Sequence, residues 1–179
     1  SLPPLAARYL DFSAAQRRRL DSADGGRDLA WWREHLAGLE PLELPRDRVA
    51  DHRTGAPGAA PRATLPASLA SRLRALAQRE RATLFTVMLA AYQALLMRLS
   101  GREDFAVGTP VTGRPRRELE DVVGYFVNPL VLRTDLSGNP SFRQLLGRSQ
   151  ATMLDALEHQ QVPFERLVSE LAPERRADR

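Results

Sequence analysis

Apolar residues recur every three to four positions in several segments, and this spacing predicts helices. The segment 84–100 is apolar nearly all round apart from Thr86, Gln93 and Arg98, so we expect its helix at the centre of a fold. A further helix is predicted over residues 8–22, and Gly25 and Gly26 are expected to end it. The other predicted helices cover residues 28–39, Pro66 to about Ala77, Ser141 to about His159, and residues 163–168.

Runs of β-branched and aromatic residues predict strands. Short strands are expected over residues 62–65 and 104–111. The central strand is expected over residues 122–133, which contain Gly124 near their start and are followed by a turn cluster at residues 135–140. Because helices alternate with few strands, the pattern predicts an α/β or α+β sandwich.

Asn128 is the one polar amide within the apolar part of the predicted central strand. A buried amide without partners costs about 1–3 kcal/mol. Asn128 is therefore either a hydrogen-bonded structural residue, for example at a bulge beside Pro129, or a residue exposed in a pocket that uses it. The sequence leaves both alternatives open.

Proline and glycine interrupt the periodicity between residues 40 and 61, which predicts a crossing linker or an extended loop. Because this segment separates two helical blocks, it is the expected lobe boundary. We therefore expect residues 1–60 to hold lobe-connecting helices and the linker, and residues 61–179 to form a lobe.

The chain has 179 residues, 43% hydrophobic and 27% charged, which is enough for a domain with its own core. The absence of Cys excludes disulfides, thiolate nucleophiles and zinc–thiolate sites, and it is compatible with the cytoplasm, where we expect the protein. Residues 1–5 lack the pattern of a signal peptide, and residues 84–100 are a poor membrane span, so we expect no membrane partner.

The net charge of +4 comes with 26 basic residues, all of them Arg. The cluster Arg17 to Arg19 is flanked by Asp11 and Asp21, and the arginines at 114–117 precede acidic residues. A nucleic-acid surface needs clustered cations interleaved with aromatic residues. We therefore expect no nucleic-acid partner.

The three histidines, His35, His52 and His159, lie far apart and have no second ligand at metal spacing. His159 is explained by a cation at a helix C-terminus, with a catalytic role as the alternative. No Gly-x-Ser-x-Gly motif is present, and the glycines at 108, 113 and 124 lack nucleotide-loop spacing. The residues therefore predict no hydrolase site, metal or bound cofactor.

Five segments resemble, in order, motifs of the condensation domains of nonribosomal peptide synthetases. Residues 107–114, Val-Gly-Thr-Pro-Val-Thr-Gly-Arg, are similar to the family's Val-Gly-x-Pro-x-x-Gly-Arg loop. Residues 123–129, Val-Gly-Tyr-Phe-Val-Asn-Pro, resemble Ile/Val-Gly-x-Phe-Val-Asn-Thr. The other three segments are residues 9–13, Tyr-Leu-Asp-Phe-Ser; residues 42–48, Leu-Glu-Leu-Pro-Arg-Asp-Arg; and residues 159–165, His-Gln-Gln-Val-Pro-Phe-Glu.

The resemblance implies a chloramphenicol-acetyltransferase-like two-layer α/β sandwich. This chain would be the C-terminal lobe of a condensation-domain pseudodimer, with residues 61–179 as the acetyltransferase-like part. In that family the phosphopantetheine arms of two carrier proteins enter a tunnel, and the acceptor amine attacks the donor thioester to form an amide. The implied partners are peptidyl or aminoacyl carrier proteins, the N-terminal lobe and a neighbouring adenylation domain, with no cofactor bound directly.

The family's catalytic His-His-x-x-x-Asp-Gly motif is missing, because this chain has no adjacent His pair. We therefore expect no catalytic residue here, and the chain alone to be inactive. Two alternatives remain: a noncatalytic module that docks a carrier protein or a neighbouring domain, and an acyltransferase relative that makes esters.

The resemblance also implies which residues form the tunnel wall. Asn128 would position the donor thioester or the tetrahedral intermediate, and Arg114 would either pair with the Asp of the missing motif or bond nearby carbonyls. Tyr125 and Phe126 are expected to pack, and residues 159–165 to form a corner between helices. Pro129 and Gln161 depart from the family's Thr and Asp. The expected tunnel residues are Gly108, Pro110, Gly113, Arg114, Gly124 and Asn128.

A lobe separated from the rest of a shared core should expose apolar surface. We expect this on the central strand or on the helix 84–100, with dimerisation or aggregation as the result.

Overall fold

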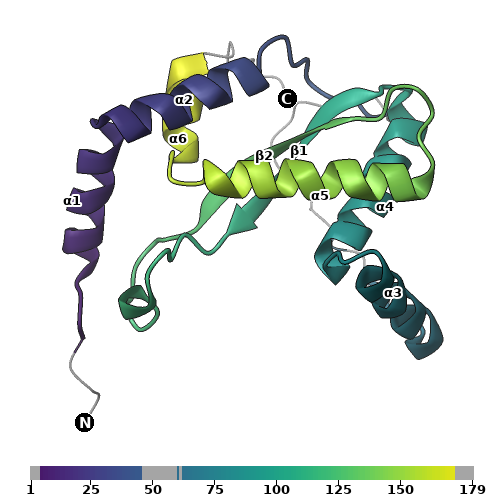
Figure 1. The fold of residues 1–179 in the computed structure, drawn as a ribbon, viewed down its shortest axis with the longest axis horizontal. Helices are drawn as coiled ribbons and strands as arrows, with labels where there is room; N and C mark the ends of the chain where they lie inside the picture. Colours follow the sequence, from purple (N-terminus) through teal and green to yellow (C-terminus); the bar gives the residue numbers. More distant parts are fainter. Residues whose placement is uncertain (1–4, 46–59, 61, 172–179) are drawn as a thin grey trace. The chain divides into compact units, whose positions relative to one another are not determined.

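The computed structural model describes residues 5–45, 60 and 62–171. These residues form helices and one two-stranded sheet (Figure 1). In chain order the elements are α1 (Tyr9–Leu20), α2 (Ala23–His35), α3 (Ala67–Arg79), α4 (Leu84–Ser100), β1 (Asp104–Val111), the 3-10 turn η1 (Arg117–Leu119), β2 (Asn128–Asp135), α5 (Phe142–Glu158) and α6 (Phe164–Leu171).

Helix α4 and strand β1 have the bounds that the sequence predicts. The Thr83 hydroxyl accepts a hydrogen bond from the Thr86 backbone N–H at 3.0 Å and so caps the first turn of α4. Gly101, with φ of 70°, adopts the left-handed conformation that ends the helix. Local capping chemistry therefore suffices to place this helix.

Two strand predictions are wrong. Residues 62–65 form no strand, and β2 begins only at Asn128 instead of at Val122. Val122 and Phe126 are instead buried in a cluster with Phe12 and Leu119. An alternating apolar pattern does not distinguish a paired strand from a loop that places the same side chains on a core.

The prediction that Gly25 and Gly26 end the first helix is also wrong. Both glycines lie inside α2, whose N-cap is Ser22. A Cβ on Gly25 would lie 2.4 Å from the Arg19 carbonyl oxygen, at the end of α1. This glycine therefore permits the close approach of two consecutive helices and does not mark a break.

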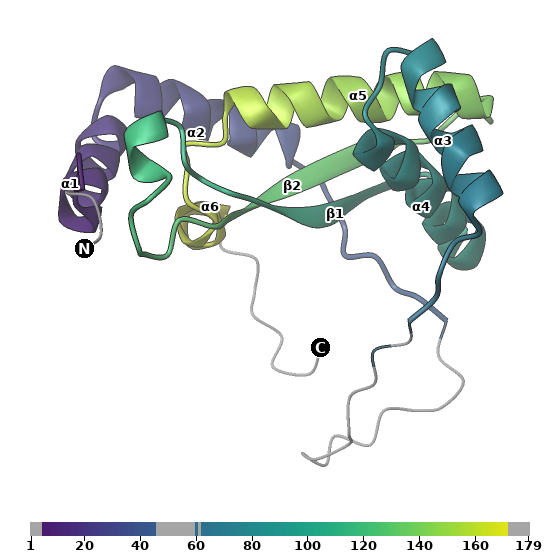
Figure 2. The ribbon, with the colours of Figure 1, turned by 90° about the horizontal axis from the view of Figure 1, so that it is seen from below.

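The two strands lie side by side (Figure 2). Leu136 N–H donates to the Glu103 carbonyl at 2.7 Å, so the end of β2 lies beside the beginning of β1 and the pair is antiparallel. A two-stranded sheet needs other packed elements for stability.

The described residues group into two compact units, and β1, β2 and α5 each continue from one unit into the other. The division at residue 60 stays a prediction, and most of the expected linker, with His52, lies outside the described residues. One unit contains residues 5–39, 106–133 and 152–171, and the other contains residues 40–45, 60, 62–105 and 134–151.

The second unit has a polar bridge inside its core. Gln93 of α4 is fully buried, and its Oε1 accepts a hydrogen bond from Ser149 Oγ of α5 at 2.6 Å. Its Nε2 donates to Thr134 Oγ1 of β2. The polar residue that interrupts the apolar pattern of α4 is therefore satisfied by two other elements.

Among the described residues, no single helix is long and apolar enough to cross a membrane. Within these residues, only α3 and α4 taken together have the length and apolar composition of a membrane span, and they meet at a bend of 104°.

Candidate functional site

All six expected tunnel residues belong to the first compact unit, but they occupy three different environments. Gly113 and Arg114 lie against the buried Phe126, and Gly124 lies against the ring of Tyr9, which packs on Phe126. Asn128 lies at the start of β2, and Gly108 and Pro110 lie exposed on β1.

Asn128 forms hydrogen bonds to the corner between α5 and α6. Its Nδ2 donates to the carbonyl oxygens of Gln160 and Val162, each at 3.0 Å. Its Oδ1 accepts from the backbone N–H of Phe164 at 2.9 Å. Both amide hydrogens are used, so the structure supports the alternative of a satisfied structural amide, although its partners lie in the corner instead of across the sheet.

The corner that the sequence predicts over residues 159–165 comprises residues 159–163, because Phe164 and Glu165 already belong to α6. This corner has no repeating backbone hydrogen-bond pattern of its own, and Asn128 supplies three bonds to it from a different part of the chain. Its geometry therefore depends on β2.

Arg114 closes the turn that precedes β2. Its Nη1 donates to the Val122 carbonyl at 2.9 Å and also to the Leu119 carbonyl. The guanidinium carbon lies 4.0 Å from the centre of the Phe126 ring, which is a cation–π distance. Of the two alternatives for Arg114, the structure shows the bonding of nearby carbonyls.

Among the expected tunnel residues, Gly113 and Gly124 have no room for a Cβ. Gly113 has φ of 61°, and a Cβ there would lie 1.7 Å from the Phe126 carbonyl oxygen. A Cβ on Gly124 would lie 2.3 Å from the ring of Tyr9. The motif glycines of this region therefore permit close packing.

Tyr9 connects the first motif to the central one. Its hydroxyl donates to the Tyr125 carbonyl at 3.0 Å, and its ring packs edge-on against Phe126 with 5.2 Å between ring centres. Phe126 is buried as expected, but the prediction that Tyr125 packs is wrong, because 68% of its surface is exposed. The contact of Tyr125 with Tyr9 uses the backbone, so side-chain type did not indicate it.

Gly108 and Pro110 differ from the other four residues. They alternate along β1 and so point to the same face, and both are exposed. A Cβ on Gly108 would meet no atom within 4 Å. Packing within the described residues therefore gives no reason for a glycine at this position.

His159 has an orienting partner that the sequence did not reveal. Its Nδ1 lies 2.9 Å from Asp28 Oδ1, and Asp28 Oδ2 accepts from Arg19 Nη2 at 2.8 Å. The indole of Trp31 stacks on the His159 ring with 4.2 Å between centres, and Trp32 Nε1 donates to the His159 carbonyl at 3.0 Å. This His and its Asp are therefore part of a packed polar network between α2 and the α5–α6 corner.

Asp11, in the first motif, is exposed and paired. Arg8 donates to it from Nε and Nη2, each at 3.1 Å, and from its backbone N–H at 3.2 Å. These hydrogen bonds, first the side-chain ones, hold the pKa of the Asp11 carboxyl below its usual range. They also close the first turn of α1.

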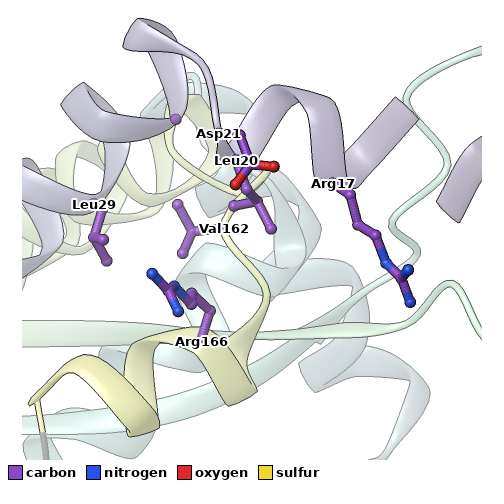
Figure 3. A pocket seen from close by; sticks show the side chains of 7 residues that line it. Arg17, Leu20, Asp21, Leu29, Val162 and Arg166 are labelled. Carbon is purple, nitrogen blue, oxygen red and sulfur yellow. The ribbon is translucent and has the colours of Figure 1, made fainter. Parts of the chain in front are cut away.

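A separate pocket of about 300 Å³ lies between α1, α2 and α6 (Figure 3). Arg166 is directed toward Leu29 and Val162, whereas Arg17 extends away from them. Arg166 is already paired with Glu170, with 2.6 Å between Nη2 and Oε1. The pocket contains none of the six expected tunnel residues.

Within the described part of the chain, no three His, Asp or Glu side chains gather in a way that would hold a metal ion.

Comparison with known proteins identifies a family. The model of the family described as "Condensation domain" matches residues 1–179. A linear gramicidin synthase protein of Brevibacillus parabrevis is 46% identical over 97% of this chain and 3% of its own length. Phosphinothricin tripeptide synthetase PhsB of Streptomyces viridochromogenes is 44% identical over 98% of this chain and 15% of its own. The chain thus spans only a small part of these relatives.

Solved structures agree with this match. The X-domain from teicoplanin biosynthesis superposes with a TM-score of 0.82 and 30% identity, covering all of this chain and 41% of that one. The first condensation domain of the calcium-dependent antibiotic synthetase, solved with a substrate analogue, gives a TM-score of 0.76 and 28% identity, covering 96% of this chain and 38% of that one. The α/β fold is therefore confirmed as that of condensation domains.

Proposed function

The chain belongs to the condensation-domain family, and from this premise we propose that it takes part in amide bond formation by a nonribosomal peptide synthetase. In the proposed reaction, the amine of an acceptor carried on one carrier protein attacks the thioester carbonyl of a donor carried on another. The amide C–N bond forms, the C–S bond breaks, and the phosphopantetheine thiol leaves with a proton. The family match over the whole chain is the observation that carries this proposal.

We propose that this chain contributes tunnel wall and no catalytic group. The catalytic His motif of the family has no counterpart in these residues. The exposed face of β1 with Gly108 and Pro110 supports a wall role, because a glycine inside a strand often marks close approach by a ligand or another backbone. A phosphopantetheine arm or its acyl group is the proposed neighbour.

Asn128 is proposed to act as a positioning residue. Donation to a developing oxyanion would require it to give up a bond to Gln160 or Val162, since both amide hydrogens are engaged. By holding residues 159–163 in place, Asn128 would shape the tunnel wall without losing either of these hydrogen bonds. In this proposal Asn128 affects catalysis through the backbone that it fixes.

A noncatalytic docking module is the second candidate. One structural relative, the X-domain from teicoplanin biosynthesis, was solved as a complex with OxyB, and it is 31% identical with a TM-score of 0.78. A condensation-type fold can therefore bind a partner protein. For this chain the candidate partners are a carrier protein, an adenylation domain or another neighbouring domain.

A hybrid domain tests the proposal. The matched segment of the linear gramicidin synthase protein is replaced by this chain within its condensation domain, and the hybrid is assayed with two carrier proteins that hold aminoacyl thioesters. We expect an amide product, detected by mass spectrometry, that disappears when the upstream His motif is replaced by Ala. A folded hybrid that binds carrier proteins but forms no amide would contradict the catalytic proposal and favour docking.

A further inference from the structure

The pocket between α1, α2 and α6 has an apolar part and a charged part. The apolar part is aliphatic, with one side chain each from α1, α2 and the α5–α6 corner: Leu20, Leu29 and Val162. The charged part consists of Arg17, Asp21 and Arg166. All of these residues belong to the first compact unit, so the pocket forms within one unit.

An anionic and a cationic group line the pocket from different elements. Asp21 follows the last residue of α1, where the carbonyl end of the helix favours a cation. Arg166 comes from α6, and its guanidinium is directed toward the aliphatic part of the lining. In the view of Figure 3 the Asp21 carboxylate lies above Val162, and the Arg166 guanidinium lies below it. A ligand that lies on this aliphatic surface can therefore contact both charges.

Both charged groups can accept a ligand. Among the described residues, the Asp21 carboxylate has no ion pair. Arg166 Nη2 pairs with Glu170 Oε1 at 2.6 Å, but Glu170 Oε2 also accepts a hydrogen bond from Arg33. Glu170 therefore keeps a cationic partner if Arg166 turns to another carboxylate. A guanidinium also has five N–H donors, so Arg166 can bind a second carboxylate without releasing the first.

The combination of these groups selects one class of ligand. A ligand with only a negative charge would meet the Asp21 carboxylate, and one with only a positive charge would meet two arginines. An uncharged apolar ligand would remove water from all three charges without pairing them. A molecule with an ammonium group, a carboxylate and an aliphatic side chain complements every part of the lining.

The volume of about 300 Å³ is at the lower end of the range for ligand pockets and so favours a small molecule. We propose that this pocket binds a free aliphatic α-amino acid, with its ammonium group at Asp21, its carboxylate at Arg166 and its side chain on the aliphatic part of the lining. The proposal does not rest on amide formation, because the pocket contains none of the expected tunnel residues and binding needs no carrier protein.

Isothermal titration calorimetry and thermal unfolding test the pocket with leucine as the probe. Both are applied to the 179-residue chain and to the hybrid domain described above. A ligand that binds only the folded protein stabilises it, so we expect Tm to rise with the leucine concentration. Three analogues each lack one recognised group: N-acetylleucine lacks the ammonium charge, leucinamide the carboxylate, and glycine the aliphatic side chain. We expect each to bind at least about 10-fold more weakly than leucine.

Arg166→Gln and Arg33→Gln are a matched pair. Both variants remove an arginine that contacts Glu170, but only Arg166 lines the pocket. We expect Arg166→Gln to weaken leucine binding by at least about 10-fold and Arg33→Gln to change it by less than about 2-fold. Asp21→Asn should remove most of the preference for leucine over N-acetylleucine, because it removes the partner of the ammonium group.

Several results would overturn the inference. One is a chain or a hybrid domain that does not bind leucine. Another is binding of N-acetylleucine or leucinamide as tight as that of leucine, because the pocket would then recognise a single charge. Equal losses for Arg166→Gln and Arg33→Gln would place the binding outside this pocket. A folded hybrid that binds leucine but forms no amide contradicts only the proposed function.

Discussion

His159 Nδ1 lies 2.9 Å from Asp28 Oδ1, although 131 residues separate them in the chain. Asp28 is buried on α2, and it also accepts a hydrogen bond from Arg19 at 2.8 Å. One carboxylate thus connects the end of α1, the middle of α2 and the corner after α5. This corner is also the one that Asn128 holds, so two independent anchors fix residues 159–163.

Asp28→Asn tests the first anchor. We expect it to lower the free energy of unfolding by about 1–3 kcal/mol, because a buried acceptor for both Arg19 and His159 loses its charge. Asp24→Asn is the matched control, since Asp24 also pairs with Arg19 but is more than half exposed. Urea unfolding followed by Trp fluorescence measures both. Equal losses for the two variants would contradict the role assigned to Asp28.

Asn128→Asp tests the second anchor. The change removes two amide hydrogens and places carboxylate oxygens against the carbonyls of Gln160 and Val162, so we expect a loss of about 2–4 kcal/mol. The chain has one other Asn, Asn139, which is exposed and also precedes Pro. Asn139→Asp should change stability by less than about 0.5 kcal/mol.

Chemical denaturation of both variants measures the difference. If Asn128 acted by contacting the substrate, Asn128→Asp would abolish amide formation by the hybrid domain without lowering its stability. That result would refute the positioning role.

Gly113→Ala and Gly108→Ala compare the stability loss at a tightly packed glycine with that at an exposed glycine. At Gly113 a Cβ meets the Phe126 carbonyl and requires a strained backbone, so we expect a loss of at least about 2 kcal/mol. At Gly108 it meets nothing, and we expect a change within about 0.5 kcal/mol.

The same Gly108→Ala variant tests the tunnel wall. If an acyl or phosphopantetheine group passes over β1 at this point, the hybrid domain with Gly108→Ala should form amide more slowly while its Tm stays unchanged. An unaffected rate would indicate that the exposed face of β1 is not in the tunnel.

Glu80 provides a pH-dependent contact in the second unit. Arg79 Nε lies 3.1 Å and Arg143 Nη2 lies 3.0 Å from Glu80 Oε1. These side-chain hydrogen bonds, that of Arg79 first, hold the pKa of the Glu80 carboxyl below its usual range. A carboxyl whose pKa is lower in the folded state stabilises the fold above its unfolded pKa. This contribution is lost as the pH falls through the folded pKa.

Glu80→Gln should therefore lower stability at neutral pH and converge with the wild type in acid. Unfolding by urea between pH 7 and about pH 3 measures this difference. Glu158→Gln serves as a control at an exposed position. A difference between Glu80→Gln and the wild type that stays constant with pH would show that the contact does not depend on charge.

The sequence alone determined the elements whose signals are local. The helix 84–100 and the strand 104–111 were predicted with their correct ends, because apolar spacing, a Thr cap and a terminal Gly act within a few residues. The family followed from motifs that are continuous in the chain, and the exposed surface on α4 followed from a helix that is apolar nearly all round.

The tertiary structure decided everything that depends on a distant partner. Val122 and Phe126 pack in a cluster with Phe12 instead of belonging to a strand, and Gly25 accommodates a neighbouring helix instead of ending one. The partners of Asn128 and His159 come from segments far away in the chain, and side-chain type alone does not specify them. Local chemistry sets where an element begins and ends, whereas the role of a polar or small residue depends on which surface the fold brings against it.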